Sequence, residues 1–183
     1  MEIVKDLILL LERNPYSKEI KPLIDKVEAS KKVKLSQQLN QLDGIWELRW
    51  SSSKAPFLNY NPLLDNLQIL ETTKNRGINL LKPRGLQSIA GTGITIKLAL
   101  INDIRVSVTF TGAGIIGPGI FDKKVQMIAK IRKEQKGWLD ITYLNENIRI
   151  CKGDKGTTFA LLKRTNNILF DKFKIYMNSI CFS

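Results

Sequence analysis

Beyond Gly44, apolar and polar residues alternate with a period of two through a series of short segments separated by turn residues. This is the period of a β-strand with one buried face, because successive side chains point to opposite sides of a sheet. No helical crossover pattern separates the segments, so we expect antiparallel strands in a barrel or sandwich. The positions predicted to share one face of each strand are Trp46, Leu48 and Trp50; Ile94, Ile96, Leu98 and Leu100; Val106, Val108 and Phe110; Val125, Met127, Ala129 and Ile131; and Thr157, Phe159 and Leu161.

Before Gly44 the apolar residues recur at helical spacing. Ile3, Leu7 and Leu11 lie on one face of a predicted first helix, Asn14-Pro15 ends it, and a second helix begins near Pro22. Helices followed by strands predict an α+β fold with an antiparallel sheet. We expect a helical segment at 1–41 that packs on the barrel, a barrel at 42–165, and an amphipathic tail at 166–183. The aromatic-rich tail is predicted either to pack on the barrel or to contact a membrane or partner.

Composition excludes several classes of enzyme. The chain of 183 residues carries a net charge of +12 and contains no histidine, which removes serine triads, Cys-His pairs and histidine zinc sites. We find no phosphate-binding P-loop and no paired carboxylates, and therefore expect no catalytic residue and no metal. The two cysteines, Cys151 and Cys181, are predicted to be free thiols in a reducing cytosol.

The positive charge indicates a soluble basic protein or affinity for an anionic membrane surface or nucleic acid. The densest basic stretch, FDKKVQMIAKIRKEQKG at 121–137, has no aromatic residues interleaved as single-strand binders do. We therefore expect no nucleic acid partner.

One short stretch matches a nucleotide-binding motif letter for letter. GAGIIG at 112–117 follows a strand-like run and matches GxGxxG, which binds dinucleotides when a helix begins there. Pro118-Gly119 and another strand-like segment follow instead. The motif therefore predicts a loop or tight turn between strands rather than a nucleotide site.

Two segments resemble one known family. LDGIWELRWSSS at 42–53 and YLNENIRICKGDKGTTFALLKR at 143–164 resemble the first strand and closing signature of the plastid lipid-associated proteins, also called fibrillins or plastoglobulins. The resemblance spans about 42–164 and implies a lipocalin-like β-barrel with helices ahead of it. Asn145 stands where the family commonly has aspartate, and Cys151 where serine is usual.

The resemblance also implies a function. It is the non-enzymatic binding of small hydrophobic molecules, such as a carotenoid, quinone or other prenyl lipid, without a cofactor. The protein would lie in the cytoplasm at the periphery of thylakoid membranes or lipid bodies. The N-terminal stretch is not rich in serine and arginine, so we expect no transit peptide and a cyanobacterial-type member of the family.

Particular residues are candidates for this role. In lipocalin-like barrels a tryptophan of the first strand packs against an arginine of the last strands, which here implies the barrel-closing pair Trp46 and Arg149. Arg149 stands between Ile148 and Ile150, and as a closing residue it predicts a loss of a few kcal/mol in Arg149→Ala. The ligand-binding candidates, each also interpretable as packed core, are Trp46, Trp50, Phe57, Tyr60, Phe110, Tyr143 and Phe159, with polar groups from Arg84, Arg105 and Lys97.

Two alternatives remain open on the sequence. Lipocalin-like barrels also include lyases that attach bilins to light-harvesting proteins, and inward arginines suit bilin propionates. An assembly protein at the membrane, its barrel filled by its own side chains, would show the same alternation. The segment APFLNYNPLLDN at 55–66 is predicted to be a long loop at the barrel mouth, acting as a lid or a membrane-touching rim.

Overall fold

A computed structural model describes residues 2–55, 58–85, 90–120, 123–165 and 167–179. Its helices are α1 (Glu2–Arg13), α2 (Ile20–Ser30), α3 (Leu35–Gln38), the 3₁₀ helices η1 (Leu39–Leu42) and η3 (Thr72–Lys74), and α4 (Asn167–Ser179). Its strands are β1 (Gly44–Ser51), β2 (Leu64–Glu71), β3 (Arg76–Pro83), β4 (Gly91–Leu100), β5 (Arg105–Ile120), β6 (Lys123–Leu144), β7 (Ile148–Gly153) and β8 (Thr158–Arg164).

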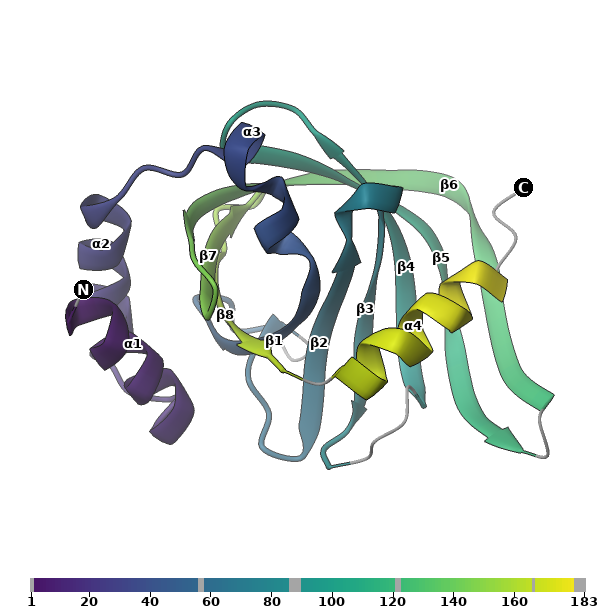
Figure 1. Cartoon of the computed structure of the whole chain (residues 1–183). Coiled ribbons are helices and arrows are strands. Elements are labelled where there is room, and N and C mark those ends of the chain that lie inside the picture. The colour runs from purple at the N-terminus through teal and green to yellow at the C-terminus, as the bar shows by residue number, and fades with distance from the viewer. Residues whose placement is uncertain (1, 56–57, 86–89, 121–122, 166, 180–183) are drawn as a thin grey trace.

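The eight strands form a closed barrel in sequence order (Figure 1). Each strand pairs antiparallel with the next, and β8 pairs with β1, where Ile45 lies opposite Arg164 and Trp46 opposite Lys163. Closure gives each of these eight strands a hydrogen-bonded neighbour on both sides. The predicted α+β class with an antiparallel sheet is confirmed.

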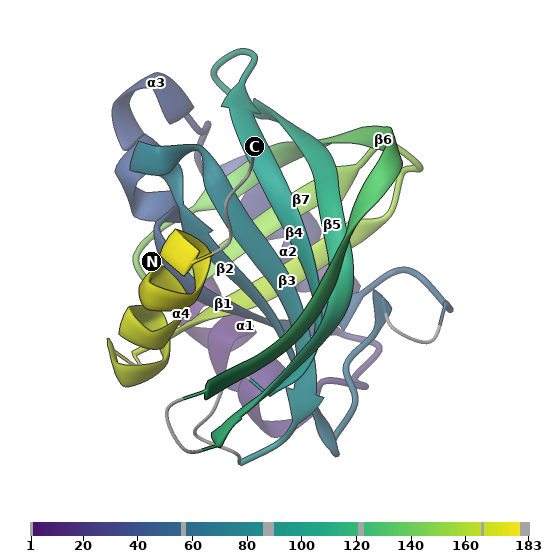
Figure 2. The same cartoon turned by 90° about the vertical axis from the view of Figure 1, so that its right-hand side faces the viewer.

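Strands β5 and β6 are the longest pair and cross the front of Figure 2. The GAGIIG motif lies within β5 rather than in a turn, so the predicted loop is wrong. A Cβ on Gly114 would overlap the carbonyl oxygen of Met127 on β6, and one on Gly112 would lie 2.8 Å from the Ile128 side chain. The glycines therefore permit close strand approach, and no helix begins there to form a dinucleotide site.

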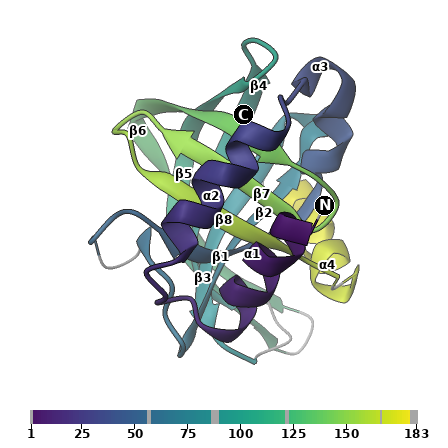
Figure 3. The same cartoon turned by 90° about the vertical axis from the view of Figure 1, so that its left-hand side faces the viewer.

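Helices α1 and α2 cover the outer face of β7 and β8 (Figure 3). Their apolar residues meet the outward side chains of both strands in one cluster: Val4, Leu7, Leu11, Ile20, Ile24 and Val27 with Ile148, Ile150, Ala160 and Leu162. This is the stripe that the helical spacing predicts.

Helix α4 packs on the outer face of the neighbouring part of the wall (Figure 1). Leu169, Phe173, Tyr176 and Met177 cluster with outward residues of β1, β2 and β3, including Ile69. Both faces of these strands are therefore buried. Within the described parts of the chain, the helices are too short or too polar to cross a membrane.

Candidate functional site

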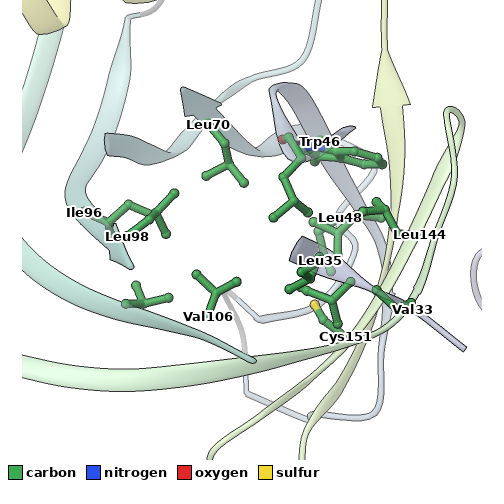
Figure 4. Packing of buried hydrophobic residues seen from close by; sticks show 14 residues of the cluster. Val33, Leu35, Trp46, Leu48, Leu70, Ile96, Leu98, Val106, Leu144 and Cys151 are labelled. Atoms are coloured by element: carbon green, nitrogen blue, oxygen red, sulfur yellow. Dashed lines mark hydrogen bonds between the residues drawn. The ribbon is translucent and has the colours of Figure 1, made fainter. Parts of the chain in front are cut away.

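Apolar side chains from most of the strands line the barrel interior (Figure 4). Trp46 and Leu48 come from β1, Leu70 from β2, and Cys151 from β7. Leu35 of α3 and Leu42 of η1 belong to the same cluster, so these short helices close one end of the barrel. We call this end, with the neighbouring β4–β5 hairpin, the capped end.

A cavity of about 60 Å³ remains beneath the cap. Most of its lining is leucine, valine and isoleucine, and Leu39 and Leu42 of η1 contribute. The polar lining consists of Gln68, Thr72, Asn75 and Arg149. The cavity thus combines apolar walls with a few polar groups, the usual composition of a ligand pocket.

Arg149 enters the barrel because of strand alternation. Its neighbours Ile148 and Ile150 face outward into the helical cluster, so Arg149 must face inward. It is 1% exposed and donates a hydrogen bond to the Gln68 side-chain oxygen. Gln68 in turn donates to Asn79 Oδ1 at 3.0 Å.

The guanidinium of Arg149 carries a buried charge without an acidic partner. No carboxylate within the described ranges forms an ion pair with it, and its Nε has no hydrogen-bond partner. Burial lowers the pKa of Arg149, and an arginine nevertheless stays protonated in proteins. Burial of the uncompensated charge opposes folding.

Trp46 lies beside this charge. The Arg149 guanidinium carbon lies 5.0 Å from the centre of its ring, and Lys163 Nζ lies 5.1 Å away. The indole Nε1 donates to the carbonyl of Leu42 at 2.8 Å, and Lys163 donates to that of Gln41 at 3.1 Å. The predicted pair of Trp46 and Arg149 is thus in contact, and it lies directly under η1.

The other aromatic candidates divide between the two faces of the wall. Phe110 and Phe159 pack against the interior cluster. Trp50 and Tyr143 instead pack with α1 and α2 on the outside. Register shifts between Leu48 and Trp50 and between Ile141 and Tyr143 explain this, because an extra residue reverses the face of everything beyond it.

Phe57 lies outside the described residues. Tyr60 lies outside the barrel, its ring 4.4 Å from the guanidinium carbon of Arg49. Arg49 and Arg84 both pair with the buried carboxylate of Glu47, at 3.1 and 3.0 Å. These charges hold the β1–β2 connection against the wall, at the end opposite to α3 (Figure 1).

Arg105 and Lys97 also lie on the outer wall. Arg105 donates to both oxygens of Asp140, at 2.6 and 2.8 Å, and stacks 3.8 Å from the Trp138 ring centre. Those hydrogen bonds lower the pKa of Asp140. Lys97 is exposed beside Arg76 of the neighbouring strand.

Sequence reasoning missed Gln68, Asn79, Thr72 and Asn75. Gln68 and Asn79 face each other across β2 and β3, strands that the alternation did not predict. The available signal was the polar residue between Leu67 and Ile69, which takes the inward position because α4 draws its neighbours outward.

Comparisons with known proteins agree with the resemblance. The sequence pattern of the PAP_fibrillin family matches residues 9–162. A 34-residue stretch, 18% of this chain, is 62% identical to the probable plastid-lipid-associated protein 12, chloroplastic, of Arabidopsis thaliana, and it covers 8% of that protein. No solved structure matches the chain.

Proposed function

Because the chain belongs to the PAP_fibrillin family, we propose that it binds a small hydrophobic molecule inside a lipocalin-like barrel, without catalysis. The ligand class is a quinone, carotenoid or other prenyl lipid, bound at photosynthetic membranes or lipid bodies. The relative's name associates that protein with plastid lipids. The observation that carries the proposal is the buried, acid-free guanidinium of Arg149 beside the interior cavity.

A ligand oxygen would complete the hydrogen bonding of this guanidinium. The Arg149 Nε has no partner, and leaving a buried donor unpaired costs about 1–3 kcal/mol, more when it is charged. A quinone carbonyl supplies the missing acceptor, whereas a pure hydrocarbon such as β-carotene does not. Among the three ligand types, the interior therefore suits a quinone or another oxygen-bearing prenyl lipid best.

The cavity also restricts how such a ligand enters. Its volume of about 60 Å³ is well below the roughly 300–1,000 Å³ of ordinary ligand pockets. Leu39 and Leu42 of η1 line it, so displacement of the cap would enlarge it. Hydrogen bonds to the cap from the barrel include Trp46 Nε1 to the carbonyl of Leu42 at 2.8 Å, and Leu35 N of the cap donates to the carbonyl of Asp103 at 2.8 Å. Binding is thus expected to move α3 and η1.

The test is a titration with decyl-plastoquinone, followed by quenching of tryptophan fluorescence. Arg149→Met should weaken binding at least tenfold, the equivalent of one lost hydrogen bond to a charged donor. Arg105→Met is the matched control, because Arg105 also stacks on a tryptophan but lies outside the barrel. Equal affinity in all three proteins would reject the interior site.

One observation favours a second candidate, the assembly protein with a filled barrel. The cavity as it stands has room for only a few atoms. Native mass spectrometry of protein purified from a pigmented photosynthetic host separates the two. A stoichiometric prenyl lipid supports the binding protein. An empty protein that also fails to bind decyl-plastoquinone supports the assembly role.

A further inference from the structure

The β4–β5 hairpin presents an exposed apolar tip. Leu100, Ile101 and Ile104 are 39%, 59% and 42% exposed within a few residues of one another. Single exposed apolar residues are ordinary, but a contiguous group marks an interaction surface. The tip lies beside α3 at the same end of the barrel, as Figures 1 and 2 both show.

Lysines flank this tip. Lys31, Lys32 and Lys34 occupy the connection between α2 and α3, and all three are exposed. The connection is held against the hairpin, because Leu35 N donates to the Asp103 carbonyl at 2.8 Å and Ser36 N to its carboxylate at 3.3 Å. Lys31 and Lys32 form no ion pair with any part of the chain that the structure describes.

A basic groove of about 480 Å³ continues this surface down the outer wall. Lys74, Arg76, Lys97, Ser107 and Thr109 line it. Lys74 and Arg76 share the carboxylate of Glu71, while Lys97 has no ion-pair partner among the residues described. The groove and the interior cavity both contact Leu98 and Ala99, so they lie on the two sides of β4.

The acidic residues of this region are already engaged. Asp103 accepts the Ser36 amide and interacts with Lys34. Asp140 is held by Arg105, and Glu71 by Lys74 and Arg76. The exposed lysines Lys31, Lys32, Lys34 and Lys97 outnumber the carboxylate of Asp103 beside the tip, so the charge around the tip and the groove is positive.

We propose that the capped end docks on an anionic phospholipid bilayer, with Leu100, Ile101 and Ile104 in the interface and Lys31, Lys32, Lys34 and Lys97 facing lipid phosphates. Apolar side chains flanked by lysines suit an anionic lipid surface. The inference rests on the proposed function. The cap covers the cavity, and docking would place this cap against the membrane that supplies the lipophilic ligand. Leu100 links the two, because it is part of the tip and also lines the cavity.

The test is co-sedimentation with sucrose-loaded vesicles of phosphatidylcholine, with and without phosphatidylglycerol. The wild-type protein should bind only the anionic vesicles, and less at high salt. Lys31→Gln/Lys32→Gln should lower the partition coefficient by about 25-fold, at roughly fivefold per lysine. Ile101→Asp/Ile104→Asp should lower it at least as much.

The matched control is Ile168→Asp/Ile175→Asp on α4, whose two side chains are 59% and 57% exposed. It should bind vesicles as the wild type does, and thermal unfolding should show that each variant is folded. Tip variants that bind normally, or an α4 control that loses binding equally, would overturn the docking face. A dimer in sedimentation velocity that disappears with the tip variants, without vesicle binding, would also overturn it.

The quinone titration separates this inference from the proposed function. In vesicle-free solution the tip and lysine variants should keep the wild-type affinity for decyl-plastoquinone. Tip-dependent vesicle binding without quinone binding would support the docking face and reject the interior ligand. Quinone binding by a protein that does not bind anionic vesicles would support the interior ligand and reject the docking face.

Discussion

Replacing Arg149 with methionine tests what its buried guanidinium costs the fold. Methionine keeps most of the volume of the side chain and removes the charge. The lost interactions are one hydrogen bond to Gln68 and the contact with Trp46, worth about 1.5–3 and 0.5–2 kcal/mol. The variant also avoids the cost of burying a charge that has no acidic partner, which is on the order of several kcal/mol.

The lost interactions and the avoided desolvation cost nearly cancel, and the small difference favours the stability of the variant. We therefore expect the free energy of unfolding of Arg149→Met to equal that of the wild type or exceed it by up to about 2 kcal/mol. Arg149→Ala leaves a cavity beside Trp46 as well, so it should be less stable than Arg149→Met by about 2–5 kcal/mol. Truncation and charge removal thus act in opposite directions on one residue.

Urea unfolding, followed by tryptophan fluorescence and far-ultraviolet circular dichroism, measures both differences. The urea dependence of the unfolding free energy should not change, because the buried surface is the same. A loss of more than about 3 kcal/mol in Arg149→Met would refute the reasoning, since the charged hydrogen bond would then exceed its desolvation cost. Arg149 would in that case be a closing residue whose charge stabilises the ligand-free barrel.

Two further predictions concern β5 and its partners. Gly114→Ala should lower the free energy of unfolding by about 1–3 kcal/mol or more, because its Cβ would overlap the backbone of β6. Gly137→Ala is the control in the same urea unfolding experiment, because its Cβ would come no nearer than 3.4 Å to Asp154. Equal losses of stability in the two variants would contradict the explanation. The ion pair of Arg105 and Asp140 should make stability depend on pH, because hydrogen bonds from Arg105 hold the pKa of Asp140 below its ordinary value of 3.8. The wild type should therefore exceed Arg105→Met in stability above pH 3.8. The part of this difference that comes from the ion pair should be lost as the pH falls through the lowered pKa, while the part from stacking on Trp138 stays. A difference that is the same at every pH would exclude this linkage.

Alternation is clearest in strands whose inward and outward side chains differ in polarity. β1, β4 and the first part of β5 have apolar inward positions and polar or mixed outward ones, so the period of two is visible. β2 and β3 were missed because α4 packs on their outer face. With leucine and isoleucine buried on the outside and Gln68 and Asn79 on the inside, their pattern is reversed.

The same physics decided which candidate side chains reach the interior. Trp46, Phe110 and Phe159 lie on the expected face, while Trp50 and Tyr143 lie beyond register shifts that turn the strand over. A one-residue shift leaves little trace in an alternating sequence. The helices could take up the displaced aromatic rings, since α1 and α2 present an apolar stripe to that part of the wall.

Among the described residues, Arg105 and Arg149 stack on tryptophans, and their difference supports the interior as the binding site. Arg105 and Trp138 lie on the outside, where Asp140 neutralises the cation. Arg149 and Trp46 lie inside, with an unpaired Nε, no acidic partner among the described residues, and beside them a largely apolar cavity that contains a few polar groups. The outer pair is complete without a ligand, and the inner pair lacks an acceptor. An oxygen arriving through the capped end would supply that acceptor, which is why the cavity and the apolar tip that adjoins it are expected to work together.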